Sequence, residues 1–315
     1  MTVSLKGRDL IDLKNYTAVE IQEIISVASA LKSELKDAGR HARLPLAGKS
    51  IALYFEKQSL RTRVSFEVGI HQLGGQTIFI NSGSTHSGRG EPLMDTARVL
   101  SRYIHGIVYR AYNHEDVKEM AEHSGAPVIN ALCDKAHPCQ ALADLLTIYE
   151  HRGRGVKTKV AYIGDAENNV ASSLTIVLAK VGIDVSLGCP ESYGPSQDVM
   201  SAALADAKKS GARIEVFKNP EDAVRGANIV YTDVWISMGD EGETERRKKA
   251  FAGYEVTPKL MSLAAHGALF MHDMPAHRGE EVHPDVMDGD RSIVIDQAEN
   301  RLHAQKAVMA LLIGE

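Results

Sequence analysis

Apolar and polar positions alternate along the chain in a pattern that predicts strands and helices in turn. Short apolar runs bounded by polar residues or glycine predict strands, and apolar positions spaced three or four residues apart predict helices. A first helix is expected over residues 17–35, where Thr17 and Glu20 can form a capping box. Strands are then expected at 51–55, 77–80, 106–109 and 128–129, with helices after Ser59, Glu91 and His114.

A second alternating series follows a long helix expected over 137–151. Its strands are expected at 159–163, 183–187, 214–217, 229–231 and 268–271, and its last helix at about 298–312. Alternating strands and helices predict an α/β fold with two doubly wound parallel-sheet domains linked by helices. The glycines and arginines of 152–155 mark the boundary, which gives domains of 1–150, completed by 294–315, and 151–293.

Composition narrows the class of protein. The net charge of -5 disfavours nucleic acid as the main partner. No apolar run of about 18 residues occurs, so no membrane span is expected, and the first residues carry no secretory or organelle signal. The three cysteines, Cys133, Cys139 and Cys189, give no disulfide framework or zinc spacing and fit a reducing cytoplasm.

Ser59-Leu60-Arg61-Thr62-Arg63 is the most informative stretch of the chain. It follows the apolar run 51–55 and opens a helix, so free backbone N–H groups and the positive end of the helix dipole favour an anion there. Two guanidiniums favour phosphate as that anion. The alternative is a serine helix cap flanked by two solvated arginines.

Five more polar clusters follow predicted strands or open a helix beside them. They are Arg110, 137–140, 165–169, 233–239 and 272–275, counting Arg110 as the end of its own strand. In open parallel sheets, ligands bind beyond the carboxyl ends of the strands, which places the expected active site in the interdomain cleft. Taken singly, His137 is a helix cap, Asn168-Asn169 a turn and Trp235 a core residue, but together the clusters favour a site.

These clusters also carry a family resemblance that covers essentially the whole chain. The chain resembles the aspartate/ornithine carbamoyltransferase family, and within it the ornithine enzymes. The matching motifs are Ser59 to Arg63, His137-Pro-Cys-Gln140, Asp233-Val-Trp-Ile-Ser-Met-Gly239, His272-Asp-Met-Pro275 and Asp296 to His303. The Ser-Met-Gly element is the one that separates ornithine from aspartate carbamoyltransferases.

The resemblance implies transfer of the carbamoyl group from carbamoyl phosphate to L-ornithine, giving L-citrulline and phosphate. It implies a carbamoyl phosphate site of Ser59, Leu60, Arg61, Thr62, His86, Arg110, His137, Gln140, Met274 and Arg301. It implies an ornithine site of Asn169, Asp233, Ser237 and Met238. Arg110, His137, Asp273 and Arg301 are the expected catalytic residues. No cofactor or metal is required, because positioning and charge stabilisation suffice.

The resemblance further implies a homotrimer with shared active sites, in which the loop around His86 reaches the neighbouring subunit. The charged run 240–249 is expected to be a mobile loop that closes over the second substrate and excludes water. The alternative for this run is an ordinary solvated surface.

Three residues depart from the family pattern: Leu60 replaces Thr, His86 replaces Gln and Asp273 replaces Cys. A carboxylate at 273 could hold an acceptor ammonium, act as a base or select a different amine. It could also be neutral drift in a true ornithine enzyme. A carbamoyltransferase for another diamine or amino acid therefore stays open, as does a non-catalytic α/β binding protein.

Overall fold

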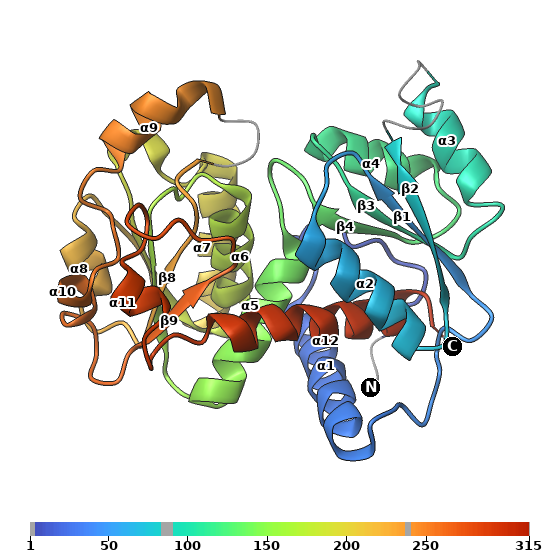
Figure 1. The fold of residues 1–315 in the computed structure, drawn as a ribbon, viewed down its shortest axis with the longest axis horizontal. Helices are drawn as coiled ribbons and strands as arrows, with labels where there is room; N and C mark the ends of the chain where they lie inside the picture. Colours follow the sequence, from blue (N-terminus) through green and yellow to red (C-terminus); the bar gives the residue numbers. More distant parts are fainter. Residues whose placement is uncertain (1–3, 83–90, 237–240, 315) are drawn as a thin grey trace. The chain divides into compact units, whose positions relative to one another are not determined.

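The computed structural model describes residues 4–82, 91–236 and 241–314, which form two compact units. The first unit contains Met1–Leu146 and Glu299–Glu315, and the second contains Thr147–Ala298. The chain passes between the units within two helices, α5 (Pro138–Arg152) and α12 (Val294–Leu312) (Figure 1). The boundaries expected at 150/151 and 293/294 lie at or within those same helices.

The first unit is built on a parallel sheet of four strands in the order β2-β1-β3-β4. The strands are β1 (Ser50–Phe55), β2 (Gln76–Asn81), β3 (Gly106–Arg110) and β4 (Val128–Leu132). All five residues of β3 are buried, as are the last five of β1. Buried central strands of a parallel sheet read as continuous apolar runs, which is why both were visible in the sequence.

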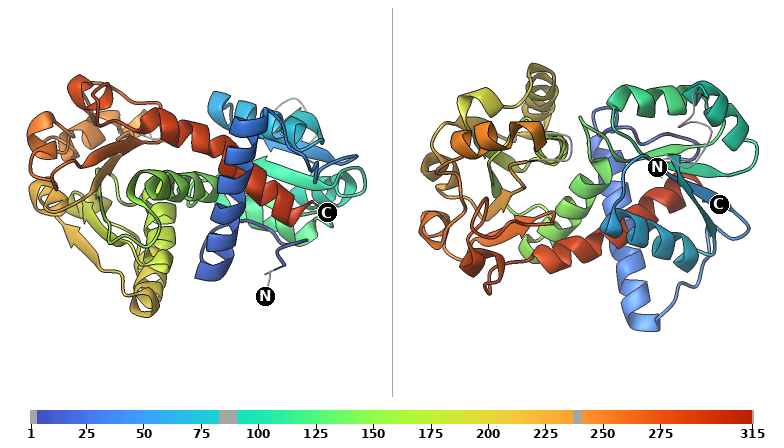
Figure 2. Two further views of the ribbon diagram at one scale, coloured as in Figure 1. Left: turned by 90° about the horizontal axis from the view of Figure 1, so that it is seen from below. Right: turned by 45° about the horizontal axis from the view of Figure 1, so that its top comes forward.

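Helices cover both faces of this sheet. They are α1 (Ala18–Ala38), α2 (Leu60–Gln72), α3 (Leu93–Leu100), α4 (His114–His123) and the end of α12. Ile107 and Tyr109 of β3 pack with residues of α3 and α4 on one face. Gly106 faces the other way, where an added Cβ would lie 2.4 Å from Ile313 beyond the end of α12. Figure 2 shows α1 beside α12 on this second face.

The second unit has a five-stranded parallel sheet in the order β7-β6-β5-β8-β9. Its strands are β5 (Lys159–Ile163), β6 (Asp184–Gly188), β7 (Ile214–Phe217), β8 (Ile229–Thr232) and β9 (Leu269–His272). Its helices are α6 (Asn169–Val181), α7 (Gln197–Ser210), α8 (Pro220–Val224), α9 (Thr244–Ala250), α10 (Pro258–Met261) and α11 (Pro284–Met287). The predicted fold class, two parallel α/β sheets with linking helices, is confirmed.

Two features differ from expectation. Several strands extend one to three residues beyond the apolar runs that predicted them, because hydrogen bonding continues onto polar residues such as Asn81 and Arg110. The charged run 240–249 is not simply a loop, since α9 occupies its second half. No helix in the described ranges is long and apolar enough to cross a membrane.

Candidate functional site

The N-terminus of α2 follows β1 after a short turn, in the first unit. Ser59 is the N-cap: its backbone is extended, and its Oγ accepts a hydrogen bond from Thr62 N at 3.4 Å. Leu60 is 77% exposed, so its side chain contributes no polar group and no packing here. The cap interpretation and the anion interpretation of Ser59 are therefore compatible, because a capped helix still presents its first N–H groups.

The two arginines of this turn have different surroundings. Arg63 turns away: its Nε donates to Glu67 at 2.9 Å, and its guanidinium lies 3.7 Å from the centre of the Phe79 ring. Arg61 is half-buried and close enough to Arg110 to lower the pKa of that residue. Of the two guanidiniums expected at the anion site, only that of Arg61 lies near Arg110.

Arg110 ends β3 and is 4% exposed. Among the described residues its guanidinium has one hydrogen-bond partner, Thr62 Oγ1 at 3.4 Å, and its Nε has none. Burial, followed by the charges of Arg301 and Arg61, lowers its pKa to about 10. Arg110 therefore lies buried beside other cations and, among the residues that the structure describes, has no carboxylate partner. Such a group of cations attracts an anion.

Arg301, on α12, completes this group. Its Nη1 donates to Gln140 Oε1 at 2.6 Å and its Nη2 to Thr62 Oγ1 at 3.4 Å. Gln140 in turn donates from Nε2 to Asp144 Oδ1 at 2.8 Å. Residues far apart in sequence, expected from separate motifs, therefore meet at one point in the first unit.

His137 lies beside these cations and is 3% exposed. Its carbonyl accepts hydrogen bonds from Gln140 N and Ala141 N, so it also begins α5, as the cap interpretation expects. Burial, followed by the charges of Arg301 and Arg110, holds the pKa of His137 well below its ordinary value. The imidazole is neutral at neutral pH and can donate a hydrogen bond without adding charge.

The second unit brings together polar residues that follow β5 and β8. Asn168 caps α6 through its Oδ1, while its Nδ2 donates to Tyr162 Oη at 2.9 Å and Asp233 Oδ2 at 3.2 Å. Burial, followed by Asp233, Asp165 and Asp273, raises the pKa of Tyr162 well above its ordinary value. Asn168 contacts Asp233, and the next residue, Asn169, which the sequence analysis placed in this site, begins α6.

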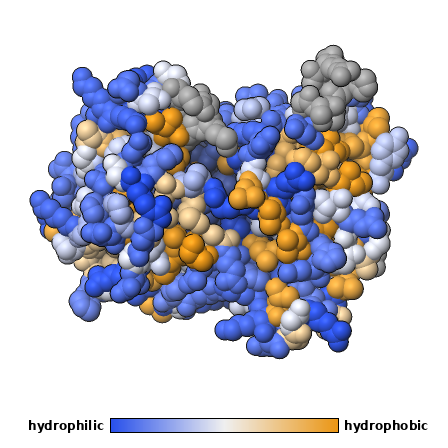
Figure 3. Space-filling view, viewed as in Figure 1, coloured by the Kyte–Doolittle hydropathy of each residue, from blue (hydrophilic) through white to orange (hydrophobic). Residues whose placement is uncertain are grey.

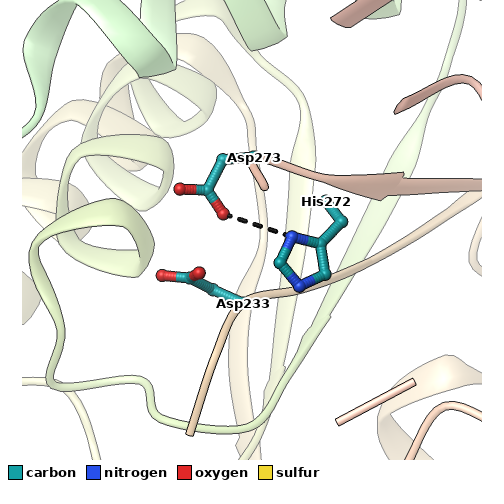
Figure 4. A group of neighbouring side chains, drawn as sticks. All are labelled: Asp233, His272 and Asp273. Carbon is teal, nitrogen blue, oxygen red and sulfur yellow. Dashed lines mark ion pairs between the residues drawn. The ribbon is translucent and has the colours of Figure 1, made fainter. Parts of the chain in front are cut away.

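His272 is the last residue of β9 and Asp273 follows it, and both lie near Asp233 (Figure 4). Met274 N donates to His272 Nδ1 at 2.9 Å, which requires an unprotonated Nδ1, and Nε2 faces Glu281 at 3.2 Å. Asp273 Oδ1 lies 3.6 Å from the same Nδ1. Asp233, His272 and Asp273 each offer one atom that could bind a metal ion, and these three atoms lie within 4.8 Å of one another. Because Nδ1 already accepts a hydrogen bond, this acidic group fits an ammonium better than a metal ion.

Sequence reasoning missed Arg247 of α9, which lies inside the charged run. It is 6% exposed, forms an ion pair with Asp165, and donates from Nε to the carbonyl of Trp235 at 2.6 Å. Burial raises the pKa of Asp165 to about 6, while Arg247 opposes that rise. A single charged run in a sequence does not reveal which of its cations is buried. Trp235 packs in the core near Phe251, as the core interpretation expects.

Three predicted site residues, His86, Ser237 and Met238, lie outside the described residues. The others divide between the units. Those of the first unit are Ser59, Leu60, Arg61, Thr62, Arg110, His137, Gln140 and Arg301, and those of the second are Asn169, Asp233, Asp273 and Met274. The interdomain location expected for the active site stays a prediction.

Known proteins match both units. Residues 8–150 match the family model for the aspartate/ornithine carbamoyltransferase carbamoyl-P binding domain, and 156–312 match the model for its Asp/Orn binding domain. The chain is 50% identical over 310 residues to an ornithine carbamoyltransferase of Hyperthermus butylicus, covering 98% of each chain. It is also 50% identical over 314 residues to one of Pyrococcus furiosus named anabolic, covering 100% of this chain and 99% of that one.

Solved structures agree with the sequence relatives. The ornithine carbamoyltransferase structure from Pyrococcus furiosus has a TM-score of 0.95 and 48% identity, covering 99% of both chains. The one from Gloeobacter violaceus has a TM-score of 0.87 and 42% identity, covering 99% of this chain and all of that one. With both family models matched along nearly its full length, this chain belongs to the aspartate/ornithine carbamoyltransferase family.

Proposed function

We propose that the protein is an ornithine carbamoyltransferase, which moves the carbamoyl group of carbamoyl phosphate to the side-chain amine of L-ornithine. The products are L-citrulline and phosphate. The observation that carries the proposal is the group of buried cations around Thr62, where Arg110 and Arg301 converge without a carboxylate partner for Arg110. The relatives named above bear the same activity in their names.

Phosphate would bind at the first turn of α2. The backbone N–H groups of residues 59–62 and the guanidiniums of Arg61 and Arg110 supply donors suited to its oxygens. Leu60, which replaces the usual Thr, should have only a mild effect, because its exposed side chain leaves recognition to the backbone.

The carbamoyl group would lie beside His137, Gln140 and Arg301. As the acceptor nitrogen forms its bond to the carbamoyl carbon, negative charge grows on the carbamoyl oxygen, and Arg110, His137 and Arg301 stabilise it. The carbon–oxygen bond to phosphate then breaks, its electron pair stays with phosphate, and phosphate takes the proton lost by the amine. Neutral His137 donates a hydrogen bond without repelling the neighbouring guanidiniums. Gln140 and the Met274 carbonyl would hold the carbamoyl NH2.

The acceptor would bind in the second unit. Asp233 and Asp273 present carboxylates to a ligand with two amino groups, and Asn169, Ser237 and Met238 would hold its carboxylate and α-amine. The charges of Asp233 and Asp273 both raise the pKa of Tyr162, so both carboxylates lie near it, which supports a cationic ligand.

A second candidate is a carbamoyltransferase for another diamine or amino acid, favoured by Asp273 where the family has Cys. The deciding experiment incubates purified protein with carbamoyl phosphate and a panel of amines, and measures each carbamoylated product and phosphate. Citrulline as the main product supports ornithine. A strong product from another amine, without citrulline, would show that the amine and not ornithine is the acceptor. No turnover with any amine would favour a non-catalytic binding protein.

The protein is further proposed to be a cytoplasmic homotrimer with shared active sites that works in the direction of amino-acid biosynthesis. An exposed apolar stripe supports self-association: Leu60, Val64 and Val68 recur every four residues on α2. Figure 3 shows apolar side chains gathered over this helix and over β2 and α3. The three cysteines, all of them among the described residues, form no disulfide, which suits a reducing compartment. The Pyrococcus furiosus relative is named anabolic, which supports the biosynthetic direction.

A further inference from the structure

Gln305 connects Arg301 to the first turn of α2. Its Oε1 accepts a hydrogen bond from Arg301 Nε at 3.2 Å, and its Nε2 donates to Ser65 Oγ at 2.9 Å. Ser65 Oγ in turn donates to the carbonyl of Arg61 at 2.7 Å. Gln305 is fully buried and Ser65 is half-buried, so the Gln305 amide is shielded from water.

The shortest contacts set the direction of each bond in this network. The Ser65 hydroxyl is nearest the Arg61 carbonyl, at 2.7 Å, and also lies 3.2 Å from the Thr62 carbonyl and from Gln305 Oε1. With its proton on a main-chain carbonyl, its oxygen accepts from Gln305 Nε2 at 2.9 Å. The amide nitrogen of Gln305 therefore faces Ser65, and its oxygen faces Arg301. Replacing this amide by a group without both a donor and an acceptor breaks the connection at both ends.

Arg301 is held at all three of its nitrogens. Gln305 accepts from Nε, Gln140 from Nη1 and Thr62 from Nη2. A planar guanidinium fixed at three points has one orientation, and three neutral acceptors fix it without cancelling its charge. Nε is the guanidinium nitrogen nearest the main chain of α12. By holding Nε, Gln305 sets the position of the two terminal nitrogens, Nη1 and Nη2.

The packing of α12 against α2 keeps the network at hydrogen-bonding distance. A Cβ added at Gly69 of α2 would lie 3.2 Å from both Lys306 Cγ and Met309 Cε of α12. The glycine thus permits the close approach of the two helices that the Ser65–Gln305 bond spans.

We propose that Gln305, with Ser65, is a positioning residue that orients Arg301 and ties it to the main chain of the phosphate-binding turn. This inference rests on the proposed function, in which Arg301 points at the carbamoyl oxygen. It goes beyond that function by assigning a role to two residues that touch no substrate.

The test begins with Gln305→Met, which keeps the length of the side chain and removes its amide. We expect kcat to fall about 10- to 100-fold, because a misplaced catalytic group loses transition-state stabilisation, while KM for carbamoyl phosphate changes less than about threefold. Ser65→Ala should lower kcat in the same direction by a smaller factor. It also serves as the test if Gln305→Met does not fold.

A double-mutant cycle with Arg301→Gln separates positioning from general stability. If Gln305 acts through Arg301, adding Gln305→Met to Arg301→Gln lowers kcat by less than about twofold more. If the fall in kcat of the double variant equals the product of the falls in the two single variants, the inference is wrong. The matched control is Gln72→Met, the same substitution on the same helix pair, where Gln72 accepts from Lys306 instead of Ser65. It should leave kcat within about twofold.

The outcomes distinguish the inference from the proposed function. If Arg301→Gln loses activity while Gln305→Met and Ser65→Ala keep theirs, the positioning role is wrong and the proposed function stands. If Arg301→Gln is as active as the unmodified protein, the proposed role of Arg301 is itself wrong.

Discussion

At the scale of single residues, neighbouring arginines of one turn have different environments. Arg61 is close to Arg110, whereas Arg63 is occupied by Glu67 and the ring of Phe79. The sequence presents them as equivalent, since both lie in the same motif. Only the direction of each side chain from the helix separates an anion-binding role from a surface role.

This difference predicts the effects of two matched substitutions. Arg61→Ala should reduce kcat/KM for carbamoyl phosphate by about 10- to 150-fold, because a hydrogen bond to a charged group contributes roughly 1.5–3 kcal/mol. Arg63→Ala should change it less than about threefold. Steady-state phosphate release measures both, with circular dichroism to confirm folding. Equal losses in the two variants would contradict the assignment.

Asp273 predicts a shift in the pH dependence of turnover. A carboxylate beside the acceptor ammonium stabilises its charged form and raises its pKa, by about one unit or more at close range. Attack requires the neutral amine, so the acidic limb of the kcat profile should move to lower pH when the carboxylate is removed. We expect Asp273→Asn and Asp273→Cys both to shift that limb down by about one unit. An unchanged profile would make Asp273 a bystander.

The motif residues of the first unit could be predicted from the sequence, whereas the residues that support them could not. Arg110, His137 and Gln140 stand at strand ends or helix starts, where parallel sheets place their ligands. Gln305 and Arg247 lie inside ordinary helical or charged runs. Nothing in their spacing shows that they are buried, because burial of a polar side chain depends on partners distant in the sequence.

At the scale of elements, α9 is fixed to the carboxyl end of β5 by one ion pair. Arg247 contacts Asp165 and the Trp235 carbonyl, and its guanidinium lies 4.9 Å from the centre of the Tyr193 ring. Arg247 and Trp235, which the hydrogen bond joins, stand on either side of the Ser-Met-Gly motif in the sequence. The charged run therefore has an anchored second half, which the expectation of a mobile loop did not include.

Breaking this pair should weaken both stability and acceptor binding. Arg247→Met leaves a buried carboxylate without its partner, which costs about 3–5 kcal/mol of unfolding free energy, and should raise KM for ornithine. Arg246→Met is the matched control, since Arg246 is exposed and pairs with Glu243 across one turn. Its cost should stay below about 0.5 kcal/mol. Urea unfolding and steady-state kinetics measure the two effects.

A second buried cation joins α12 to the end of α2. Lys306 Nζ lies 2.9 Å from His41 Nε2 and from Gln72 Oε1, and His41 Nδ1 contacts Glu34 at 2.7 Å. Burial lowers the pKa of Lys306 to about 8 from its ordinary value of 10.5. The native state therefore releases this proton at lower pH than the unfolded chain does.

The sign of the resulting stability change follows from proton linkage. Between about pH 8 and 10.5 the unfolded chain holds one more proton, so the free energy of unfolding should rise with pH by up to about 1.4 kcal/mol per unit. This contribution is complete above about pH 10.5 and is lost as pH falls from there to about 8. Urea unfolding of the protein and of Lys306→Met at pH 7.5–10 isolates it, because other groups titrate equally in both. Parallel pH profiles would show that Lys306 does not titrate in this range.

Elements were predictable where burial makes the pattern simple. β1 and β3 are buried along nearly their whole length and read as apolar runs, and the Thr17 capping box marks the start of α1. β2 at the sheet edge alternates in exposure, and its polar ends, Gln76 and Asn81, hid its true limits.

At the scale of the whole molecule, the proposed trimer with shared sites predicts complementation between inactive variants. Arg61→Ala and His86→Ala would each impair every site of their own trimers. Mixing them under conditions that exchange subunits should restore turnover, since some sites would combine an unmodified turn with an unmodified neighbouring loop. Sedimentation velocity should give three times the chain mass. A monomer in solution, or no recovery from mixed trimers of confirmed composition, would contradict shared sites.

The discontinuous make-up of the first unit has a consequence for how the protein is made. Its sheet and the turn at Ser59 leave the ribosome early, but Arg301, Gln305 and the rest of its last helix are translated only after the entire second unit. At about 5–20 residues per second, the nascent first unit waits roughly 10–30 s for its final segment. During that interval the surface that α12 will cover stays open. The part synthesised first is thus the last to be finished, and its uncovered apolar surface is prone to aggregation in the meantime.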